Sequence, residues 1–159
     1  MKRVRYLFKY ILVMMLVFFL FLQQSQKKTK DIDMEELQQK IVPDMEDGEI
    51  VSAGELELRR LYGISLQDTD GFLLYIPGEI MSVQELCIIK AKTDEEVTPL
   101  REKLKERLES QKRSFESYGT TQMAQLNEAR VITKGRYLFF AVSDEADEWQ
   151  EKFEQEITP

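Results

Sequence analysis

A long uninterrupted run of apolar residues lies near the start of the chain. Residues 6–22 contain one charged residue, Lys9, and residues 10–22 contain none. A helix of about 17 residues is roughly 25 Å long, slightly less than the ~30 Å hydrocarbon core of a bilayer. Because residues 11–22 leave no polar face for water, the pattern predicts one N-terminal transmembrane helix over residues 6–22 rather than a helix of a soluble core.

Two cleavable leaders are the alternatives to an uncleaved anchor. A secretory signal peptide needs small residues at its cleavage site, and residues 21–25 offer no such site. A lipoprotein signal needs a Cys directly after the apolar run, whereas the only Cys is Cys87. We therefore expect residues 1–5 to be a basic N-terminal segment on the cytoplasmic side, with the C-terminal domain outside the cytoplasmic membrane, as is usual for a single N-terminal anchor.

A short polar linker follows the apolar run. Residues 23–30 contain three Lys and no apolar side chain. Eight residues reach at most about 26 Å when extended and about 16 Å as a coil. The remaining residues, 31–159, form the predicted domain, and this linker is expected to keep that domain close to the membrane surface.

Five segments of residues 31–159 have helical periodicity, and most of them begin at a capping residue or end before a glycine or proline. The predicted helices are residues 34–41, Ala53–Tyr62, Thr93 or Pro99 to Tyr118, Thr120–Glu128, and a terminal helix that follows Ser143 or Asp144. In the long third helix, an apolar stripe is expected to face the core: Leu100, Leu104, Leu108, Phe115 and Tyr118.

Four shorter apolar segments alternate with these helices and predict strands: Phe72–Ile76, Gln84–Ala91, Arg130–Thr133 and Tyr137–Ser143. The first two are apolar on both faces, which is typical of strands that are covered on both sides. The order ααββααββα predicts an α+β fold, in which a roughly four-stranded sheet packs against helices.

Charge is divided unevenly along the chain. The first 30 residues carry seven Lys and Arg and no acid, whereas the remaining 129 carry 15 basic and 29 acidic residues, a net charge of −14. An acidic domain is repelled by polyphosphate backbones, so nucleic acid is not an expected partner.

The chain has no His and only one Cys. This composition excludes Ser-His and Cys-His nucleophile pairs, His-ligated metals and, within one chain, disulfides and thiolate metal clusters. The sequence Asp68-x-Asp70-Gly71 resembles the middle of a calcium loop, but Leu66 and Pro77 occupy two ligand positions, so a turn is expected. We therefore expect no cofactor and no metal site.

Four segments carry a resemblance to a known family: Leu61–Ile64, Glu85–Lys90, Arg107–Tyr118 and Gly135–Ser143. In pattern and spacing, the chain resembles the bacterial domain-of-unknown-function family number 4358 over about residues 31–157. The resemblance implies a secreted or membrane-attached single-domain protein, and it implies no activity, substrate or catalytic residue. Members often carry a lipoprotein signal, which this chain lacks, so its attachment is expected to depend on residues 6–22.

Two acidic residues are a candidate carboxylate pair. If the first two predicted strands form a hairpin, Glu79 in the turn comes near Glu85 at the start of the second strand. Two close carboxylates can act as a general acid and a general base. In the same strand, Cys87 is expected to be a small buried hydrophobic residue.

Basic residues collect on the longest predicted helix, which has six Lys and Arg against four Glu between residues 99 and 118. Arg101, Lys105, Lys112 and Arg113 are the candidates for a surface that binds anionic lipid or wall polymer. Several of these residues have a Glu four positions away, which is also how an ordinary solvated helix face looks.

Three classes of function fit these observations. The first is a membrane-tethered, non-enzymatic module at the outer face of the cytoplasmic membrane that binds or positions another envelope protein. The second is a small-ligand or ion-binding domain, and the third is a cell-envelope hydrolase that uses carboxylates. An exposed apolar patch favours the first class, an apolar pocket the second, and a polar cleft with two carboxylates the third.

Overall fold

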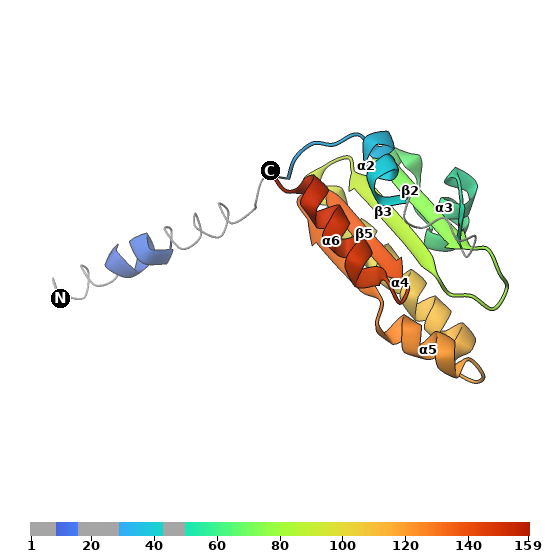
Figure 1. Cartoon of the computed structure of the whole chain (residues 1–159). Coiled ribbons are helices and arrows are strands. Elements are labelled where there is room, and N and C mark those ends of the chain that lie inside the picture. The colour runs from blue at the N-terminus through green and yellow to red at the C-terminus, as the bar shows by residue number, and fades with distance from the viewer. Residues whose placement is uncertain (1–8, 16–28, 43–49) are drawn as a thin grey trace.

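The computed structural model of the chain describes residues 9–15, 29–42 and 50–159 (Figure 1). Residues 9–15 are helical and their side chains are exposed. In the part of the chain that the structure describes, no helix is both long and apolar enough to cross a bilayer. Most of the predicted span over residues 6–22 lies outside the described residues, and so does most of the linker over residues 23–30.

Five antiparallel strands form one sheet in the order β1-β2-β3-β5-β4. The strands are β1 Ile50–Ser52, β2 Thr69–Pro77, β3 Glu85–Ala91, β4 Arg130–Lys134 and β5 Tyr137–Val142. This sheet confirms the α+β fold class, but the predicted number of about four strands was too low by one.

The missed strand is β1, the shortest of the five. Only Ile50 is buried, whereas Val51 and Ser52 are exposed, so three residues give too short a pattern to distinguish a strand from a loop. The strand exists because it pairs with the end of β2, where Ile50 lies opposite Pro77 and Ser52 opposite Tyr75.

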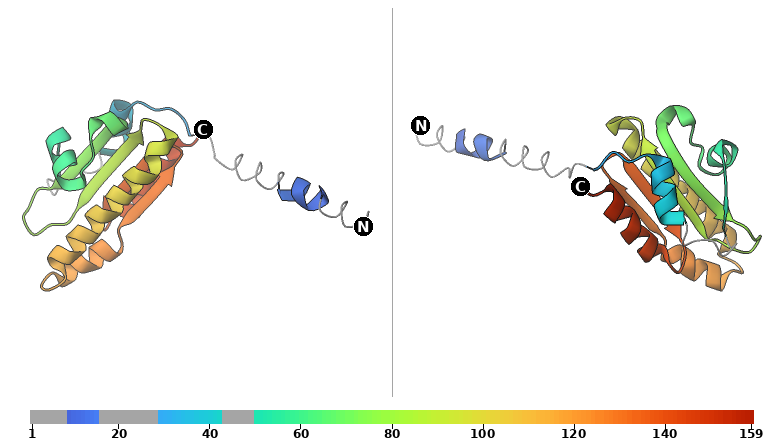
Figure 2. Two further views of the ribbon diagram at one scale, coloured as in Figure 1. Left: turned by 180° about the vertical axis from the view of Figure 1, so that it is seen from behind. Right: turned by 45° about the horizontal axis from the view of Figure 1, so that its top comes forward.

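Helices cover both faces of the sheet (Figures 1 and 2). Two of them, α2 Met34–Ile41 and α6 Ala146–Ile157, lie side by side on one face. The helices on the other face are α3 Glu55–Tyr62, α4 Asp94–Phe115 and α5 Thr120–Asn127. A short 3-10 helix over Leu66–Asp68 leads into β2.

Strand β3 lies at the centre of the sheet and contributes to both cores. Leu86 and Ile88 pack in the core beneath α2 and α6, whereas Cys87 and Ile89 pack in the core beneath α3, α4 and α5. Successive strand residues point to opposite faces, so a strand that is apolar at every position requires cover on both sides. The prediction for this strand, including the buried Cys87 thiol, is confirmed.

Local signals set the helix ends. The carboxylate of Asp33 accepts a hydrogen bond of 2.8 Å from a backbone amide in the first turn of α2. Helix α3 begins after Gly54 rather than after Ser52, because Ser52 belongs to β1 and the Glu57 carboxylate accepts the Gly54 amide at 3.2 Å. Gly63 ends α3 in the left-handed conformation, with φ 63°.

Helix α4 begins after Thr93, the earlier of its two predicted starts. Leu100 and Leu104 are buried as expected. Tyr118, which was expected in the same stripe, is 65% exposed, so this part of the prediction was wrong. The helical residues end at Phe115, and the turn that follows takes Tyr118 out of register with the stripe.

The two ends of the domain differ. At one end, the Lys30 amide donates to the Ile157 carbonyl at 2.9 Å, so the incoming chain and the C-terminus lie side by side (Figure 1). We call this end, formed by residues 29–32 with the β4–β5 turn and the end of α6, the tether end. The opposite end, which we call the tip, is formed by the β2–β3 loop (residues 78–84) and the α4–α5 turn (residues 116–119).

Candidate functional site

The tip carries three large apolar side chains that are exposed to solvent. Ile80 is 97% exposed, Met81 is 51% exposed, and Tyr118 is the third. The side-chain amide of Gln122 in α5 donates to the Met81 carbonyl at 2.9 Å, which joins the β2–β3 loop to the start of α5. Single exposed apolar residues are common on proteins, but three at one end of a small domain are typical of a contact surface.

Sequence reasoning missed the first two of these residues. Ile80 and Met81 follow Pro77-Gly78 in a segment that was assigned to a turn, and no helix or strand period includes them. The available signal was their composition, since turns between strands are normally built from Gly, Pro, Asn, Asp and Ser. An Ile-Met pair in a turn between strands therefore indicates apolar side chains that are exposed on the surface.

A buried polar cluster lies beneath the tip. The side chain of Glu85 is completely buried and accepts hydrogen bonds from the Tyr62 hydroxyl, from Gln111 Nε2 at 2.7 Å, and from Arg107. The two Arg107 bonds are 2.7 Å from Nη2 and 3.2 Å from Nε. The cluster therefore joins the start of β3 to α3 and α4 with a paired charge and several hydrogen bonds.

The low-polarity surroundings of this cluster also affect two weak acids. Burial raises the pKa of the Tyr62 hydroxyl well above its usual range, and the nearby negative charge of Glu85 raises it further. Burial, again with the charge of Glu85, raises the pKa of the Cys87 thiol. Both groups are therefore neutral at physiological pH, and a neutral thiol is a weak nucleophile.

The predicted carboxylate pair divides between two environments. Glu79 is exposed in the β2–β3 loop, whereas Glu85 points between β3 and α4, where Arg107 neutralises it. Among the described residues, the partners of the Glu85 carboxylate are Tyr62, Arg107 and Gln111. In this arrangement Glu85 holds helices in place, and the structure does not bring it together with Glu79.

The basic candidates on α4 form a stripe whose charge is partly neutralised. Arg101, Lys105 and Lys112 share one side of the helix, and Arg113 lies about 100° further round it. Arg101 and Lys105 both pair with Glu102, at 3.6 and 3.0 Å. Because Glu102 neutralises part of this stripe, the geometry gives only modest support to an anionic ligand there.

The turn predicted at Asp68–Gly71 lies beside the tether end, but only Asp68 precedes β2, and Thr69 to Gly71 are the first residues of that strand. Asp68 ends the 3-10 helix, and Asp70 pairs with Arg136 at 2.9 Å. The described residues include no group of three His, Cys, Asp or Glu side chains placed to hold a metal ion.

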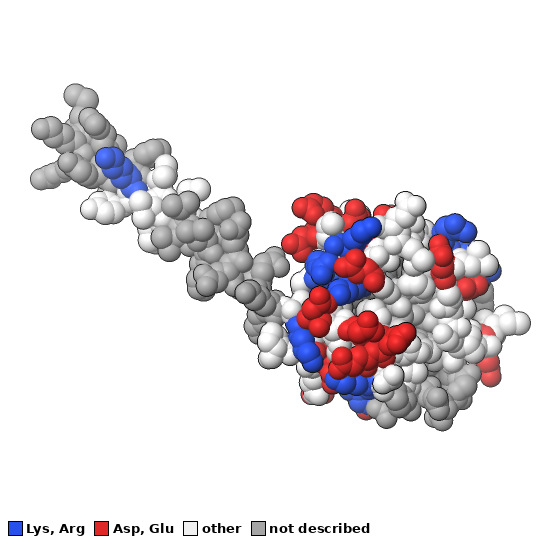
Figure 3. Space-filling model, turned by 90° about the horizontal axis from the view of Figure 1, so that it is seen from above, with Lys and Arg blue, Asp and Glu red and all other residues white. Residues whose placement is uncertain are grey.

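Charged side chains are distributed unevenly over the surface. Figure 3 shows that many Lys, Arg, Asp and Glu side chains on the face it presents gather on one side of the domain, whereas the middle of this face is largely uncharged and a few charges lie along the opposite edge. Many of these charges pair with one another. Lys40, for example, lies 3.0 Å from Glu36 and 2.6 Å from Glu156.

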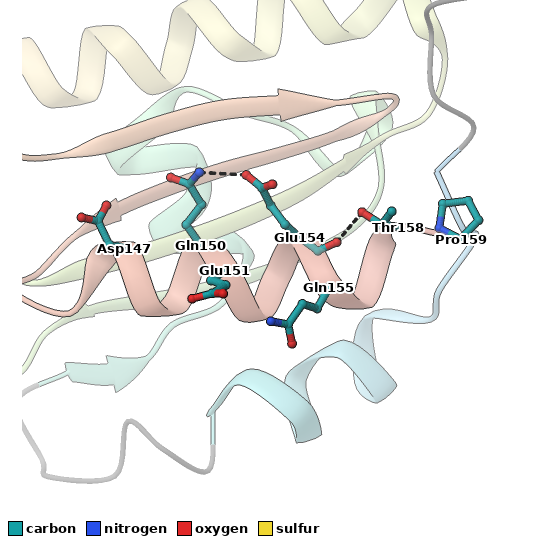
Figure 4. Close-up of a pocket in the computed structure, with 7 residues that line it drawn as sticks. All are labelled: Asp147, Gln150, Glu151, Glu154, Gln155, Thr158 and Pro159. Carbon is teal, nitrogen blue, oxygen red and sulfur yellow. Dashed lines mark hydrogen bonds between the residues drawn. The ribbon is translucent and has the colours of Figure 1, made fainter.

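Two of the surface hollows that the described residues form are large enough to consider as binding sites. One has a volume of about 600 Å³ and follows one side of α6, where its residues include Gln150, Glu151, Glu154 and Thr158 (Figure 4). The other, of about 480 Å³, lies between the start of α2 and the start of β2. It is lined by Ile32, Asp33, Met34, Glu35, Leu66, Thr69, Asp70, Gly71, Phe72 and Lys90.

Comparison with known proteins identifies one family. The profile described as domain of unknown function DUF4358 matches residues 43–143, which is more than half of the chain. Comparisons with curated proteins and with solved structures give no significant match. The match includes the centre of the sheet, the buried Glu85 cluster and the tip, and it confirms the resemblance that the sequence suggested. The chain therefore belongs to the DUF4358 family of domains of unknown function.

Proposed function

We propose that the protein is a membrane-tethered, non-enzymatic module at the outer face of the cytoplasmic membrane, which binds or positions another envelope protein through its tip. The observation that carries the proposal is the exposed apolar surface of Ile80, Met81 and Tyr118, at the end opposite to the one where the chain joins the domain. A surface placed there is available to a partner while residues 6–22 hold the membrane.

The tether end supports this orientation because the incoming chain is fastened to the domain. The Ile32 amide donates to the Tyr137 hydroxyl at 3.0 Å, and that hydroxyl donates to the Ile32 carbonyl at 3.1 Å. The Asp31 carboxylate pairs with Lys90, and this bond lowers the pKa of Asp31, so the pair is charged at neutral pH. A chain held in this way leaves the domain from one fixed point, away from the tip.

Site-specific crosslinking tests the proposed partner surface. A photoreactive amino acid at position 80 or 118 of the full-length chain, expressed in cells, is expected to give discrete crosslinks to a membrane or envelope protein. The matched control is position 66, because Leu66 is also an exposed apolar residue but precedes β2 at the tether end. Met81→Glu should abolish the crosslinks from position 80 without unfolding the domain. Equal crosslinking from position 66, or none from the tip, contradicts the proposal.

Protease accessibility tests the topology. Residues 31–159 are expected to be digested by protease that is added to intact protoplasts, while the full-length chain sediments with the membrane fraction. A domain that is protected until the protoplasts are lysed, or a soluble form trimmed after Leu22, contradicts the proposed tether and its orientation.

The second candidate function is small-ligand binding in the hollow between α2 and β2. The observation that favours it is Thr69, whose buried hydroxyl oxygen has no hydrogen-bond partner among the described residues. Thr69 lines this hollow together with Lys90 and several apolar side chains. A ligand there should shift the amide resonances of Thr69 and Gly71 in a screen of small carboxylates and amines. If these resonances remain unchanged while tip crosslinks are obtained, the first proposal is retained alone.

A further inference from the structure

Strand β2 is covered along only part of its outer edge. It has nine residues, whereas β1, its described neighbour on that side, has three, which lie opposite Tyr75 to Pro77. Next to them the Ala53 amide donates to the Leu74 carbonyl at 2.9 Å, and the chain then turns away into α3. The first half of β2 therefore has no strand on its outer side in the part of the chain that the structure describes.

Phe72 presents a pair of backbone groups at this free edge. In an antiparallel ladder, successive residues direct their N–H and C=O groups to opposite sides of the strand. The Leu74 carbonyl points towards β1, and the register of β2 with β3 is unbroken from Gly71 to Tyr75. The N–H and C=O groups of Phe72 therefore also point away from β3, and neither has a hydrogen-bond partner among the described residues. An extended peptide offers the complementary acceptor and donor.

The hollow between α2 and β2 crosses this free edge. Its lining includes Gly71 and Phe72 of the strand. It also includes Met34, which packs on the core beneath α2 and α6, whereas Phe72 packs on the core of the opposite face. The free edge from Asp70 to Leu73 is about 13 Å long at ~3.3 Å per residue. A hollow of about 480 Å³ along such an edge suits a few residues of extended chain rather than a folded domain.

Charge and polarity limit the kind of chain that fits there. Four charged residues line the hollow, and two of them, Lys90 and Asp70, already form ion pairs with residues outside it. The other two, Asp33 and Glu35, are exposed carboxylates, so they would repel an acidic ligand. Leu66 is 40% exposed at the hollow and offers a contact to apolar side chains.

We propose that this hollow binds a short peptide, about four residues long and without acidic side chains, which adds to the edge of β2 in an extended conformation. The backbone of Phe72 supplies two main-chain hydrogen bonds, and side chains of the peptide contact Met34 and Leu66. The proposal rests on the second candidate function, because it names the ligand class of the same hollow. It does not depend on the tip.

Peptide titration of the full-length chain in mild detergent tests the ligand class. The probe is a tetrapeptide of alternating valine and threonine that is blocked at both ends and so carries no charge. It is expected to shift the amide resonances of Thr69 and Gly71 and to slow hydrogen exchange at Phe72 by about fivefold or more at saturation. Two control peptides should not bind. One has glutamate in place of threonine, and the other has every amide nitrogen methylated, so it keeps the side chains but loses the N–H donors.

A matched pair of variants locates the peptide. Leu66→Ser removes part of the apolar lining of the hollow and should weaken binding by about fivefold or more. Leu56→Ser makes the same change at a leucine of α3 that is 62% exposed and does not line the hollow, so its effect should be less than twofold. If Leu66→Ser fails to fold, the exchange of Phe72 and the methylated peptide decide.

Four outcomes overturn the proposal. Shifts of Thr69 and Gly71 with small carboxylates or amines, but not with the peptide, leave the hollow a ligand site and reject the peptide class. No shift with any probe rejects the second candidate function as well. Binding of the methylated peptide, or binding without slower exchange at Phe72, shows that the edge is not used. Exchange at Phe72 that is already slow without peptide shows an occupied edge. The occupant is then a second copy if protection increases with protein concentration, and another part of the same chain if it does not.

Discussion

Arg107 and Glu85 form a two-pronged ion pair between α4 and the first residue of β3, with Arg107 Nη2 2.7 Å and Nε 3.2 Å from the carboxylate oxygens. Glu85 is fully buried and the Arg107 side chain is 16% exposed. A buried carboxylate is tolerated only when a cation and hydrogen-bond donors surround it. The packing of α4 on the sheet therefore depends on this pair.

Arg107→Leu is expected to lower the free energy of unfolding by about 3–5 kcal/mol, because it leaves the Glu85 charge buried and unpaired. Replacing both residues, in Glu85→Met with Arg107→Met, should restore part of the loss, since no buried charge remains. Urea denaturation measures both effects. The rate at which a maleimide labels the buried Cys87 thiol gives an independent measure, because labelling requires α4 to separate from the sheet. A single variant that is as stable as the wild type contradicts this role for the pair.

The buried Tyr62 hydroxyl predicts a loss of stability at alkaline pH. Burial, followed by the charge of Glu85, raises its folded pKa above the unfolded value of 10.0. The folded state then holds the proton more tightly, so this contribution is complete below pH 10.0 and is lost as the pH rises towards the folded pKa. The loss approaches about 1.4 kcal/mol per pH unit.

Tyr62→Phe separates this contribution from other groups that titrate at high pH, including Cys87. The variant should be less stable than the wild type at about pH 8, by about 1–3 kcal/mol, because Glu85 loses a hydrogen-bond donor. Its unfolding free energy should then fall less steeply between about pH 10 and 11 than that of the wild type. Parallel curves would show that Tyr62 titrates normally.

Periodicity recovered most of the fold. The strands β2 to β5 and all five helices of the domain were predicted. Most of them have a buried stripe or a buried run long enough to show its period, whereas β4, which is only half-buried throughout, was predicted from its place beside β5 across the turn at Gly135. Two features departed from this rule. Strand β1 is defined by its pairing with β2, because its own three residues show no clear pattern. Tyr118 has the spacing of the apolar stripe of α4, but the helix ends at Phe115, before it reaches Tyr118.

The candidate site was less predictable, for a physical reason. Glu85 was recognised as a possible functional carboxylate, but its partners Arg107 and Gln111 are 22 and 26 residues away. Only the packing of α4 across β3 brings these side chains together, and one sequence contains no signal for that register. Arg107 was counted with the helix's surface charges for the same reason.

Gly63 provides a test of local backbone strain. Its φ of 63° is unfavourable for residues with a Cβ, although a Cβ at this position would meet no atom within 4 Å. Gly63→Ala should therefore cost about 1 kcal/mol from the backbone alone. Gly54→Ala is the control, because Gly54 has a φ of −106° and its Cβ would make only an ordinary contact with Glu57. Equal losses measured by thermal unfolding would exclude strain as the cause.

Because the hydrogen bonds that hold the incoming chain lie at the tether end, a change there is expected to leave the local stability of the tip unchanged. Tyr137→Phe removes the hydroxyl that both accepts the Ile32 amide and donates to its carbonyl, and it leaves this buried amide without a partner. The expected cost is about 1–3 kcal/mol, confined to residues 29–32 and the elements they contact. Hydrogen exchange of Lys30 and Ile32 should therefore speed up, while amides of the tip keep their wild-type protection.

The matched control is Tyr75→Phe, which removes only the acceptor of a hydrogen bond of 2.9 Å from Gln38 in α2. It should leave the exchange of Lys30 and Ile32 unchanged. Tip crosslinks from position 80 should persist in Tyr137→Phe if the tip alone recognises the partner. They should weaken if recognition also needs the domain to be held in one orientation, because a loosened tether end lets the tip sample many directions at the same distance from the membrane.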